Sequence, residues 1–344
     1  MQIVEITGER ACGLAERPTP VVANGYVLLK VHVAPMCNEY LAYRDGVYLE
    51  RNRPDSLGHE MAGEVVEAPP DSPLRPGDRV VALCGYPCGR CEPCQRGYYA
   101  HCVRTDDPRE VCGSPSGECG FAQYAVKPAG MLVEIPAGMS YEHASMACCG
   151  LGPTFGAMER SGVRPGETVL ITGLGAVGLG GVINAAHRGA RVVCVVRSPY
   201  RAGLAEKLGA DLVVDPGAGD AHAKIMEFTG GLGVHHAIEC SGQAEYQRLA
   251  VDAVRRLGSV VFLAEPGELS VHIDNDLVQR GVTLAGSLDI NRNDANALLE
   301  VIAANAAKLD TFVTHRLPMS RVGEAFEDQM ARTCGKAVLY PWRS

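Results

Sequence analysis

The sequence predicts an α/β protein in which an irregular antiparallel β-barrel precedes a doubly wound parallel sheet. Three observations lead to this prediction. The chain has 344 residues, which is enough for about two domains. Short β segments separated by Gly/Pro turns fill the first 135 residues or so, with no long amphipathic helix between them. After about residue 150, near-continuous apolar runs alternate with helix-length segments, which is typical of a parallel sheet covered on both faces.

The composition excludes several classes of protein. Hydrophobic residues make up 47% of the chain and charged residues 21%, which is typical of a globular protein and not of a disordered or fibrous one. The net charge of −8 leaves no basic surplus, and aromatic residues are scarce at 6%, so we expect no nucleic acid as a partner. The start lacks the features of a secretory signal, and no apolar stretch approaches the ~18 residues that cross a bilayer. We therefore expect a cytoplasmic protein without a membrane partner.

Each predicted element follows from a short run of apolar residues. The barrel strands are expected at Gln2–Ile6, Val27–Val33, Gly63–Glu67, Arg79–Leu83 and Phe121–Val126. The parallel strands are expected at Thr168–Thr172, Arg191–Val196, Asp211–Val214, Val234–Glu239, Ser259–Leu263 and Val282–Ala285. Helices are expected at Ala176–Arg188, Tyr200–Leu208, Ala221–Phe228 and Ala244–Arg256. The helix Asp294–Ala307 and the segment after it are expected to return to the first domain, which gives domains at 1–150, 151–290 and 291–344.

Four cysteines form a compact motif within residues 84–105. Cys88, Cys91, Cys94 and Cys102 follow the spacing C-x2-C-x2-C-x7-C. Two-residue gaps let successive thiolates converge on one ion, and four thiolates complete a tetrahedral zinc shell without an open position. A cluster of free thiols or an iron–sulfur site are the alternatives. We expect a structural zinc ion, because clustered cysteines without a secretory signal favour metal over disulfides.

A glycine-rich turn follows the predicted strand Thr168–Thr172 and opens a helix. Its residues are Gly173, Gly175, Ala176, Val177 and Gly178, in the pattern G-x-G-x-x-G. In this strand–turn–helix context the glycines permit a tight turn and close approach of a pyrophosphate to the helix N-terminus. A turn without a ligand is the alternative. We expect the turn to bind a dinucleotide.

The acid that would bind the ribose 2′-hydroxyl of NAD(H) is missing. It is expected about 20 residues after the glycines, near Val196. The chain continues there with Arg197, Ser198 and Arg201. Two guanidinium groups and a hydroxyl suit a 2′-phosphate, so we expect NADP(H) in preference to NAD(H). The alternative is that the two arginines belong to a solvated loop.

Seven segments, in this order, carry a resemblance to a known family. They are Cys37, Gly58-His59-Glu60, the four-cysteine motif, Gly120–Tyr124, the turn Gly173–Gly178, Glu239–Gly242 and Ala285–Ser287. Over essentially the whole chain, the sequence resembles the zinc-dependent alcohol dehydrogenases of the medium-chain dehydrogenase/reductase family, in particular the sorbitol- and threonine-dehydrogenase-like branch. The resemblance implies a GroES-like catalytic domain, a Rossmann domain, and assembly into homodimers or homotetramers through the strand Val282–Ala285.

The resemblance also implies a second, catalytic zinc ion, hence two per chain. Cys37 and His59 match two of its ligands, and the third is expected from Cys148 or Cys149, of which we prefer Cys149. Glu60 matches an acid near the zinc. Residues implied to contact the cofactor are Thr154, beside the nicotinamide, and Cys240, Ser241 and Ser287. An open position on such a zinc suits a Lewis acid for an alcohol or carbonyl oxygen.

One segment departs from the family pattern. Relatives usually carry Ser or Thr two residues after the first zinc cysteine and then Asp, whereas this chain has Glu39 and Tyr40. Glu39 could serve as a catalytic acid/base whose pKa is tuned toward neutrality. It could instead recognise a cationic substrate such as an amino sugar or aminocyclitol, or indicate a different reaction. The remaining alternative is that Glu39 points to solvent.

These observations predict a zinc- and NADP(H)-dependent oxidoreductase. Its substrate is expected to be a secondary alcohol or the corresponding ketone, in the class of polyols, sugars or aminocyclitols. The first alternative is an NADPH-dependent reductase of an imine or activated C=C bond. The second is a protein that senses NADPH without catalysis, which an open zinc site argues against.

Overall fold

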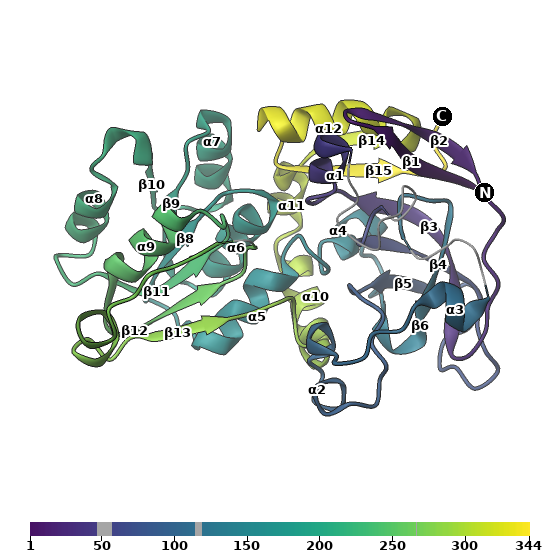
Figure 1. Ribbon diagram of the computed structural model, residues 1–344, viewed down its shortest axis with the longest axis horizontal. Coiled ribbons are helices and arrows are strands. Elements are labelled where there is room, and N and C mark those ends of the chain that lie inside the picture. The colour runs from purple at the N-terminus through teal and green to yellow at the C-terminus, as the bar shows by residue number, and fades with distance from the viewer. Residues whose placement is uncertain (47–56, 114–118, 266) are drawn as a thin grey trace. The chain divides into compact units, whose positions relative to one another are not determined.

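The computed structural model describes residues 1–46, 57–113, 119–265 and 267–344, and the chain forms two compact units (Figure 1). The first unit comprises Met1–Cys149, Asn291–Ala304 and Val313–Ser344. The second comprises Gly150–Ile290 and Asn305–Phe312. In the described residues, none of the helices has both the length and the apolarity needed to cross a lipid bilayer.

The first unit is built on a seven-stranded, mostly antiparallel sheet. Its order is β14 (Val313–Pro318), β15 (Lys336–Tyr340), β3 (Tyr26–Pro35), β4 (Met61–Glu67), β5 (Arg79–Ala82) and β7 (Leu132–Glu134), and β6 (Tyr124–Pro128) also pairs with β3. Only β14 and β15 run parallel to each other among these pairs. A hairpin of β1 (Gln2–Gly8) and β2 (Ala11–Glu16) lies outside this sheet.

All five segments predicted as barrel strands form strands, four of them close to the predicted bounds, but β1 pairs with β2 outside the seven-stranded sheet. β6 begins three residues later than predicted, because the carbonyl of Phe121 accepts a hydrogen bond from the backbone of Val4 at 2.8 Å instead of joining the ladder with β3. The strands β2, β7 and β14 were not predicted, because they are short or partly polar, and β15, a five-residue run that is mostly apolar, was not predicted either. Helices of this unit are α1 (Tyr40–Asp45), α2 (Glu92–Gln95), α3 (Pro108–Cys112), α4 (Tyr141–Ser145), α10 (Ala295–Ala304) and α12 (Val322–Ala331).

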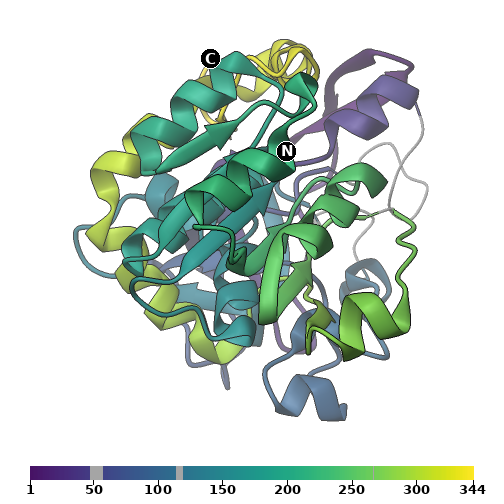
Figure 2. The same cartoon turned by 90° about the vertical axis from the view of Figure 1, so that its left-hand side faces the viewer.

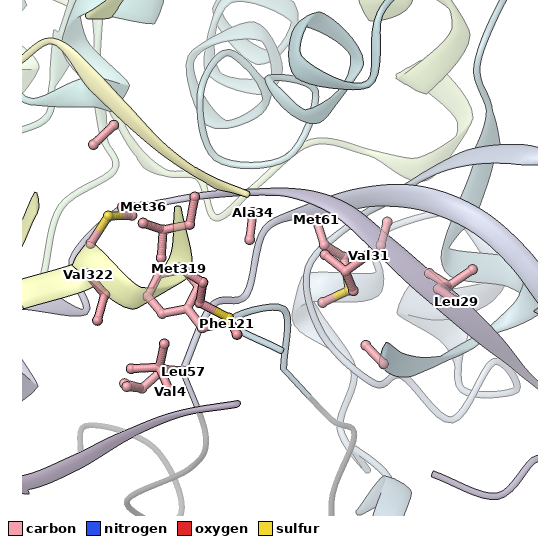
Figure 3. Packing of buried hydrophobic residues seen from close by; sticks show 14 of the residues in the cluster. Val4, Leu29, Val31, Ala34, Met36, Leu57, Met61, Phe121, Met319 and Val322 are labelled. Carbon is pink, nitrogen blue, oxygen red and sulfur yellow. The ribbon is translucent and has the colours of Figure 1, made fainter. Parts of the chain in front are cut away.

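The core of the first unit lies between its sheet and the C-terminal helix α12. Figure 3 shows Leu29 and Val31 of β3, Met61 of β4, Phe121 and Met319 among the side chains of this core. These side chains are buried, and their burial supplies the main stabilising free energy of the unit. Met36, directly after β3, and Met61, the first residue of β4, both belong to this core.

The second unit contains a six-stranded parallel sheet, which confirms the predicted doubly wound fold (Figure 2 turns this unit toward the viewer). Its order is β10 (Leu212–Val214), β9 (Arg191–Val195), β8 (Thr168–Thr172), β11 (Val234–Glu239), β12 (Val254–Phe262) and β13 (Thr283–Gly286). Its helices are α5 (Gly152–Ser161), α6 (Ala176–His187), α7 (Pro199–Leu208), α8 (Ala221–Phe228), α9 (Ala244–Ala253) and α11 (Ala306–Phe312). Since β8 lies between β9 and β11, the loops after these three strands meet at one edge of the sheet.

Two boundaries differ from the prediction. The helix expected at Ala244–Arg256 ends at Ala253, because Val254 is buried and pairs with Val234 at the start of β12. The helix expected at Asp294–Ala307 is divided into α10 and α11. The side-chain amide of Asn305, between them, lies 2.9 Å from Nδ1 of His187.

Short helical turns complete the chain. They are η1 (Tyr99–His101), η2 (Ala129–Met131), η3 (Pro216–Ala218), η4 (Ile273–Val278), η5 (Arg292–Asp294) and η6 (Met319–Arg321), and η4 is a π-helix.

Candidate active site and cofactor site

Four chemically reactive side chains converge within the first unit. Cys37 follows β3, His59 and Glu60 precede β4, and Cys149 follows α4. One ligand atom from each of these residues lies within 4.8 Å of the others, and the two sulfurs are 3.6 Å apart. Residues separated by more than one hundred positions in the sequence therefore form one cluster, which we call the first-unit cluster.

The turn before β4 requires a glycine. Gly58 has a φ of +88°, and a Cβ atom at this position would lie 2.3 Å from the ring of Phe121. Another residue would be strained and would collide with the core. Gly58 therefore lets the backbone pass close to Phe121 and place His59 beside Cys37.

Glu39 holds His59 in a defined orientation. Its Oε1 accepts a hydrogen bond from the ring Nδ1 of His59 at 2.8 Å and lies 3.3 Å from the backbone nitrogen of the same residue. Its Oε2 accepts a hydrogen bond from the backbone of Cys37 at 2.8 Å. Nε2 of His59 is left on the side of the first-unit cluster, 3.9 Å from Glu60 Oε1. A carboxylate on one ring nitrogen is the usual support for a histidine that binds a metal through the other.

The surroundings of Glu39 answer two questions raised by the sequence. The alternative in which it points to solvent is wrong, because only 6% of the residue is exposed. Burial alone would raise the pKa of Glu39, but His59 and the backbone amide of Cys37 outweigh burial and lower the pKa to about 2. This direction is opposite to the rise toward neutrality that an acid/base role would require.

Glu60 is bound to a lysine that the sequence analysis missed. Lys336, the first residue of β15, lies with its Nζ 2.5 Å from Glu60 Oε1, and both side chains are completely buried. Burial raises the pKa of Glu60 to about 7, against the opposing effect of Lys336. For Lys336 the lowering effect of burial is outweighed by Glu60, Cys37 and Cys149, so its pKa is raised. In the sequence Lys336 precedes an ordinary apolar run, and nothing local distinguishes it from a surface lysine.

The first-unit cluster fits a zinc ion. Two thiolates and an imidazole are typical catalytic zinc ligands, and a carboxylate oxygen is a third compatible type. The neighbouring sulfur of Cys149 lowers the pKa of Cys37, which favours a thiolate there. Oε2 of Glu60 is buried and has no hydrogen-bond partner among the described residues. Cys149 belongs to the cluster, whereas Sγ of Cys148 lies 3.7 Å from the carbonyl of His59 and outside it.

The four cysteines of the predicted motif, which we call the lobe cysteines, also converge. Ligand atoms of Cys88, Cys91, Cys94 and Cys102 all lie within 4.8 Å of one another. Cys91 Sγ lies 3.3 Å from Cys94 Sγ and 3.9 Å from Cys102 Sγ. Hydrogen bonds from backbone amides, that of Cys94 first, lower the pKa of Cys91 to about 6. Four thiolates of this kind form the donor set of a structural zinc site.

The glycine turn of the second unit has the shape that a pyrophosphate needs. A Cβ atom at Gly173 would lie 2.6 Å from Ser241, and one at Gly178 would lie 2.2 Å from the carbonyl of Gly173. At Gly175 no described atom comes within 4 Å of that position, and no side chain there caps the first amides of α6. The turn is therefore tight where it packs and open where a phosphate would approach the helix.

Glu239 fixes the neighbouring loop. This buried residue ends β11, and its carboxylate accepts hydrogen bonds from the backbone of Ser241 at 2.7 Å and of Gly242 at 3.2 Å. It also accepts one from the hydroxyl of Thr172, at the end of β8, at 3.3 Å. The predicted cofactor residue Ser241 is thereby held beside Gly173, and the backbone of Cys240 donates to the carbonyl of Thr172 at 2.9 Å.

The remaining predicted cofactor residues lie in different surroundings. Arg197 follows β9 and forms an ion pair with Glu245, and Ser198 caps α7 by accepting a hydrogen bond from the backbone of Arg201 at 3.3 Å. Ser287 directly follows β13. The hydroxyl of Thr154 is buried, donates to the carbonyl of Leu151 and accepts from the side chain of Asn184 at 2.8 Å.

Comparisons with known proteins cover both units. Residues 23–137 match the alcohol dehydrogenase GroES-like domain, and residues 176–304 match the zinc-binding dehydrogenases. The chain is 30% identical to an L-threonine 3-dehydrogenase of Pyrococcus furiosus over 98% of this chain and 97% of that one. It is 28% identical to a sorbitol dehydrogenase of Bacillus subtilis over 95% and 93%. A zinc-binding dehydrogenase structure from Sinorhizobium meliloti, bound to NADP, is 26% identical with a TM-score of 0.83 over 99% of each chain.

Proposed function

This chain belongs to the zinc-binding alcohol dehydrogenases of the medium-chain family, and from that premise we propose a specific activity. It transfers a hydride between NADP(H) and a secondary alcohol or its ketone, with a polyol, sugar or aminocyclitol as substrate. The observation that carries this proposal is the first-unit cluster of Cys37, His59, Glu60 and Cys149. The polyol class is supported by the sorbitol dehydrogenase among the relatives.

Each bound group supplies a defined chemistry. A zinc ion held by Cys37, His59 and Cys149 would act as a Lewis acid on the substrate oxygen, and the nicotinamide would exchange the hydride. The four lobe cysteines would hold a second, structural zinc ion. The glycine turn would bind the pyrophosphate, and Arg197, Ser198 and Arg201 would bind the 2′-phosphate.

The chain's own residues prepare this chemistry. Glu39 is a positioning residue in this proposal, since both its oxygens are occupied by His59 and Cys37. It fixes the ring so that Nε2 faces the other ligands. Lys336 holds one oxygen of Glu60 and leaves the other, Oε2, as an acceptor inside the buried site.

A second candidate reaction follows from the segment after Cys37. Glu39 and Tyr40 replace the hydroxyl residue and the acid of the usual family pattern, and Glu39 is engaged with His59. An enzyme whose proton delivery differs in this way is suited to reducing an imine or activated C=C bond with NADPH.

Metal analysis combined with a substrate screen tests the proposal. We expect two zinc ions per chain in protein purified without chelator, and NADP+-coupled oxidation of one or more polyols. The screen includes NAD+ as the alternative cofactor, and imines and enones with NADPH. Turnover of enones or imines alone would favour the second candidate, and a single zinc ion that added zinc does not supplement would contradict a catalytic metal. Assembly into homodimers or homotetramers and a cytoplasmic location remain predictions.

A further inference from the structure

Arg197, a residue proposed to bind the 2′-phosphate, forms an ion pair with Glu245. Arg197 Nη2 lies 2.5 Å from Glu245 Oε1, and each side chain is 56% exposed. The guanidinium carbon of Arg197 also lies 5.6 Å from the centre of the Tyr246 ring. This inference rests on the dinucleotide site proposed above.

The pair spans the edge of the sheet where the glycine turn lies. Arg197 comes two residues after the end of β9, and Glu245 lies in the first turn of α9, which follows β11. β8, with its glycine turn, is the strand between β9 and β11. Arg197 stands near the position where dinucleotide-binding folds carry the residue that distinguishes a ribose hydroxyl from a phosphate.

The pair is open to exchange with a ligand. Exposed ion pairs contribute little net stability because both groups can be solvated separately. A phosphate carries more charge than a carboxylate and offers more acceptor oxygens, so it can replace Glu245 on the guanidinium. The displaced carboxylate then remains close to the phosphate and repels it.

We propose that Glu245 is a specificity-determining residue that limits the affinity of this protein for the 2′-phosphate of NADP(H). It does so by competing for Arg197 and by placing a negative charge beside the phosphate. A cofactor without the 2′-phosphate does not compete for Arg197 and does not meet this repulsion. Glu245 therefore lowers the ratio of the affinity for NADP(H) to the affinity for NAD(H), and it does not contribute to the chemistry.

Isothermal titration of the full chain with two nucleotides tests this proposal. Adenosine 2′,5′-bisphosphate and adenosine 5′-monophosphate differ only in the 2′-phosphate. In Glu245→Gln we expect the bisphosphate to bind about 3–10-fold more tightly and the monophosphate to change less than about twofold, with the gain reduced by added salt. In Arg197→Gln we expect the bisphosphate to bind more weakly than in the wild type. When Glu245→Gln is added to Arg197→Gln, it should raise the affinity for the bisphosphate much less than it does in the wild type.

A matched control comes from the same helix. Asp252 on α9 pairs with Arg248 at 2.6 Å, so Asp252→Asn removes the same charge and another exposed ion pair. We expect Asp252→Asn to leave the ratio of the two affinities within about twofold of the wild type. An equal gain in Asp252→Asn and Glu245→Gln would overturn the proposal, since the effect would then be one of net charge.

The remaining outcomes separate this inference from the proposed function. Wild-type protein that prefers the monophosphate, with a gain for the bisphosphate in Glu245→Gln, would refute the NADP(H) preference and support the role of Glu245. Wild-type protein that prefers the bisphosphate, with no effect of Glu245→Gln, would support the NADP(H) preference and refute the role of Glu245. Weaker monophosphate binding in Glu245→Gln would also overturn the inference, because Glu245 would then bind the ribose. Failure of the wild type to bind either nucleotide would refute both.

Discussion

Replacing Lys336 with methionine should destabilise the first unit in a strongly pH-dependent way. Methionine retains the length of the aliphatic stem and removes the ammonium, so Glu60 loses the partner that lies 2.5 Å away. Glu60 already has a pKa of about 7 with the lysine present, and without it the pKa must rise further. The buried carboxyl of the variant therefore stays protonated when folded and ionises on unfolding.

Linkage gives the magnitude and its sign. A carboxyl whose pKa is raised in the folded state contributes stability that is lost as the pH rises from the unfolded pKa to the folded one. For the wild type this loss ends near pH 7, whereas in Lys336→Met it continues above pH 7 at up to about 1.4 kcal/mol per pH unit. We expect the destabilisation to be about 2 kcal/mol at pH 7, from the lost charged hydrogen bond, and about 3–5 kcal/mol at pH 9.

Urea unfolding of chelator-treated protein measures this difference. Trp342 is the only tryptophan of the chain, it lies in the first unit, and its ring nitrogen donates to the carbonyl of Val31 at 2.8 Å, so its fluorescence reports on that unit. Lys336→Met combined with Glu60→Gln should remove the additional pH dependence. Lys127→Met is a control for the loss of a buried ammonium group, because the Nζ of Lys127 lies 4.1 Å from the centre of the Tyr86 ring. An equal loss of stability at pH 7 and pH 9 in Lys336→Met would refute the reasoning.

Three further predictions concern the ligands and a surface ion pair. Cys149→Ala should lower the zinc content from two ions to one per chain, while Cys148→Ala should keep both, as elemental analysis of the two variants will show. Glu39→Gln should weaken the binding of the zinc ion at the first-unit cluster about 10–100-fold in a chelator competition assay, because His59 loses its supporting carboxylate. Unchanged affinity for this ion would contradict the positioning role of Glu39. Arg248 lowers the pKa of Asp276 to about 2, so the stability that this carboxylate contributes above its unfolded pKa is lost as the pH falls toward 2. Asp276→Asn should therefore flatten the acid-unfolding curve between about pH 4 and 2, as measured by circular dichroism.

The sequence predicts the local parts of this molecule well, because their signals are local. The six parallel strands are short apolar runs with turns between them, and each run is recognisable without knowledge of its neighbours. The lobe cysteines lie within fifteen residues and converge as their spacing predicts. By contrast, β15 lies late in the sequence and pairs with β3 near its start, and β14 pairs with β15, so the place of these two strands in the sheet has no local signal.

The contacts that support the first-unit cluster could not be predicted, because they depend on side chains that meet only in the folded chain. Lys336 and Glu60 are 276 positions apart, and their ion pair exists because β15 lies beside β3, which in turn pairs with β4. Burial then makes each charge depend on the other, since neither could remain ionised there alone at low cost. A lysine in an otherwise apolar strand is thus explained only by its partner.

Glu39 shows why a departure from a family pattern is difficult to interpret from sequence. Compared position by position, it replaces a hydroxyl residue, which suggests altered proton delivery. In the structure its carboxylate reaches His59 and the backbone of Cys37, so the replacement bears first on the orientation of a zinc ligand. The two interpretations separate experimentally, because a positioning carboxylate controls zinc affinity and a proton-transfer group controls turnover of the zinc-loaded enzyme. Glu39→Asp distinguishes them further: a shortened side chain that still reaches His59 should restore much of the zinc affinity lost in Glu39→Gln.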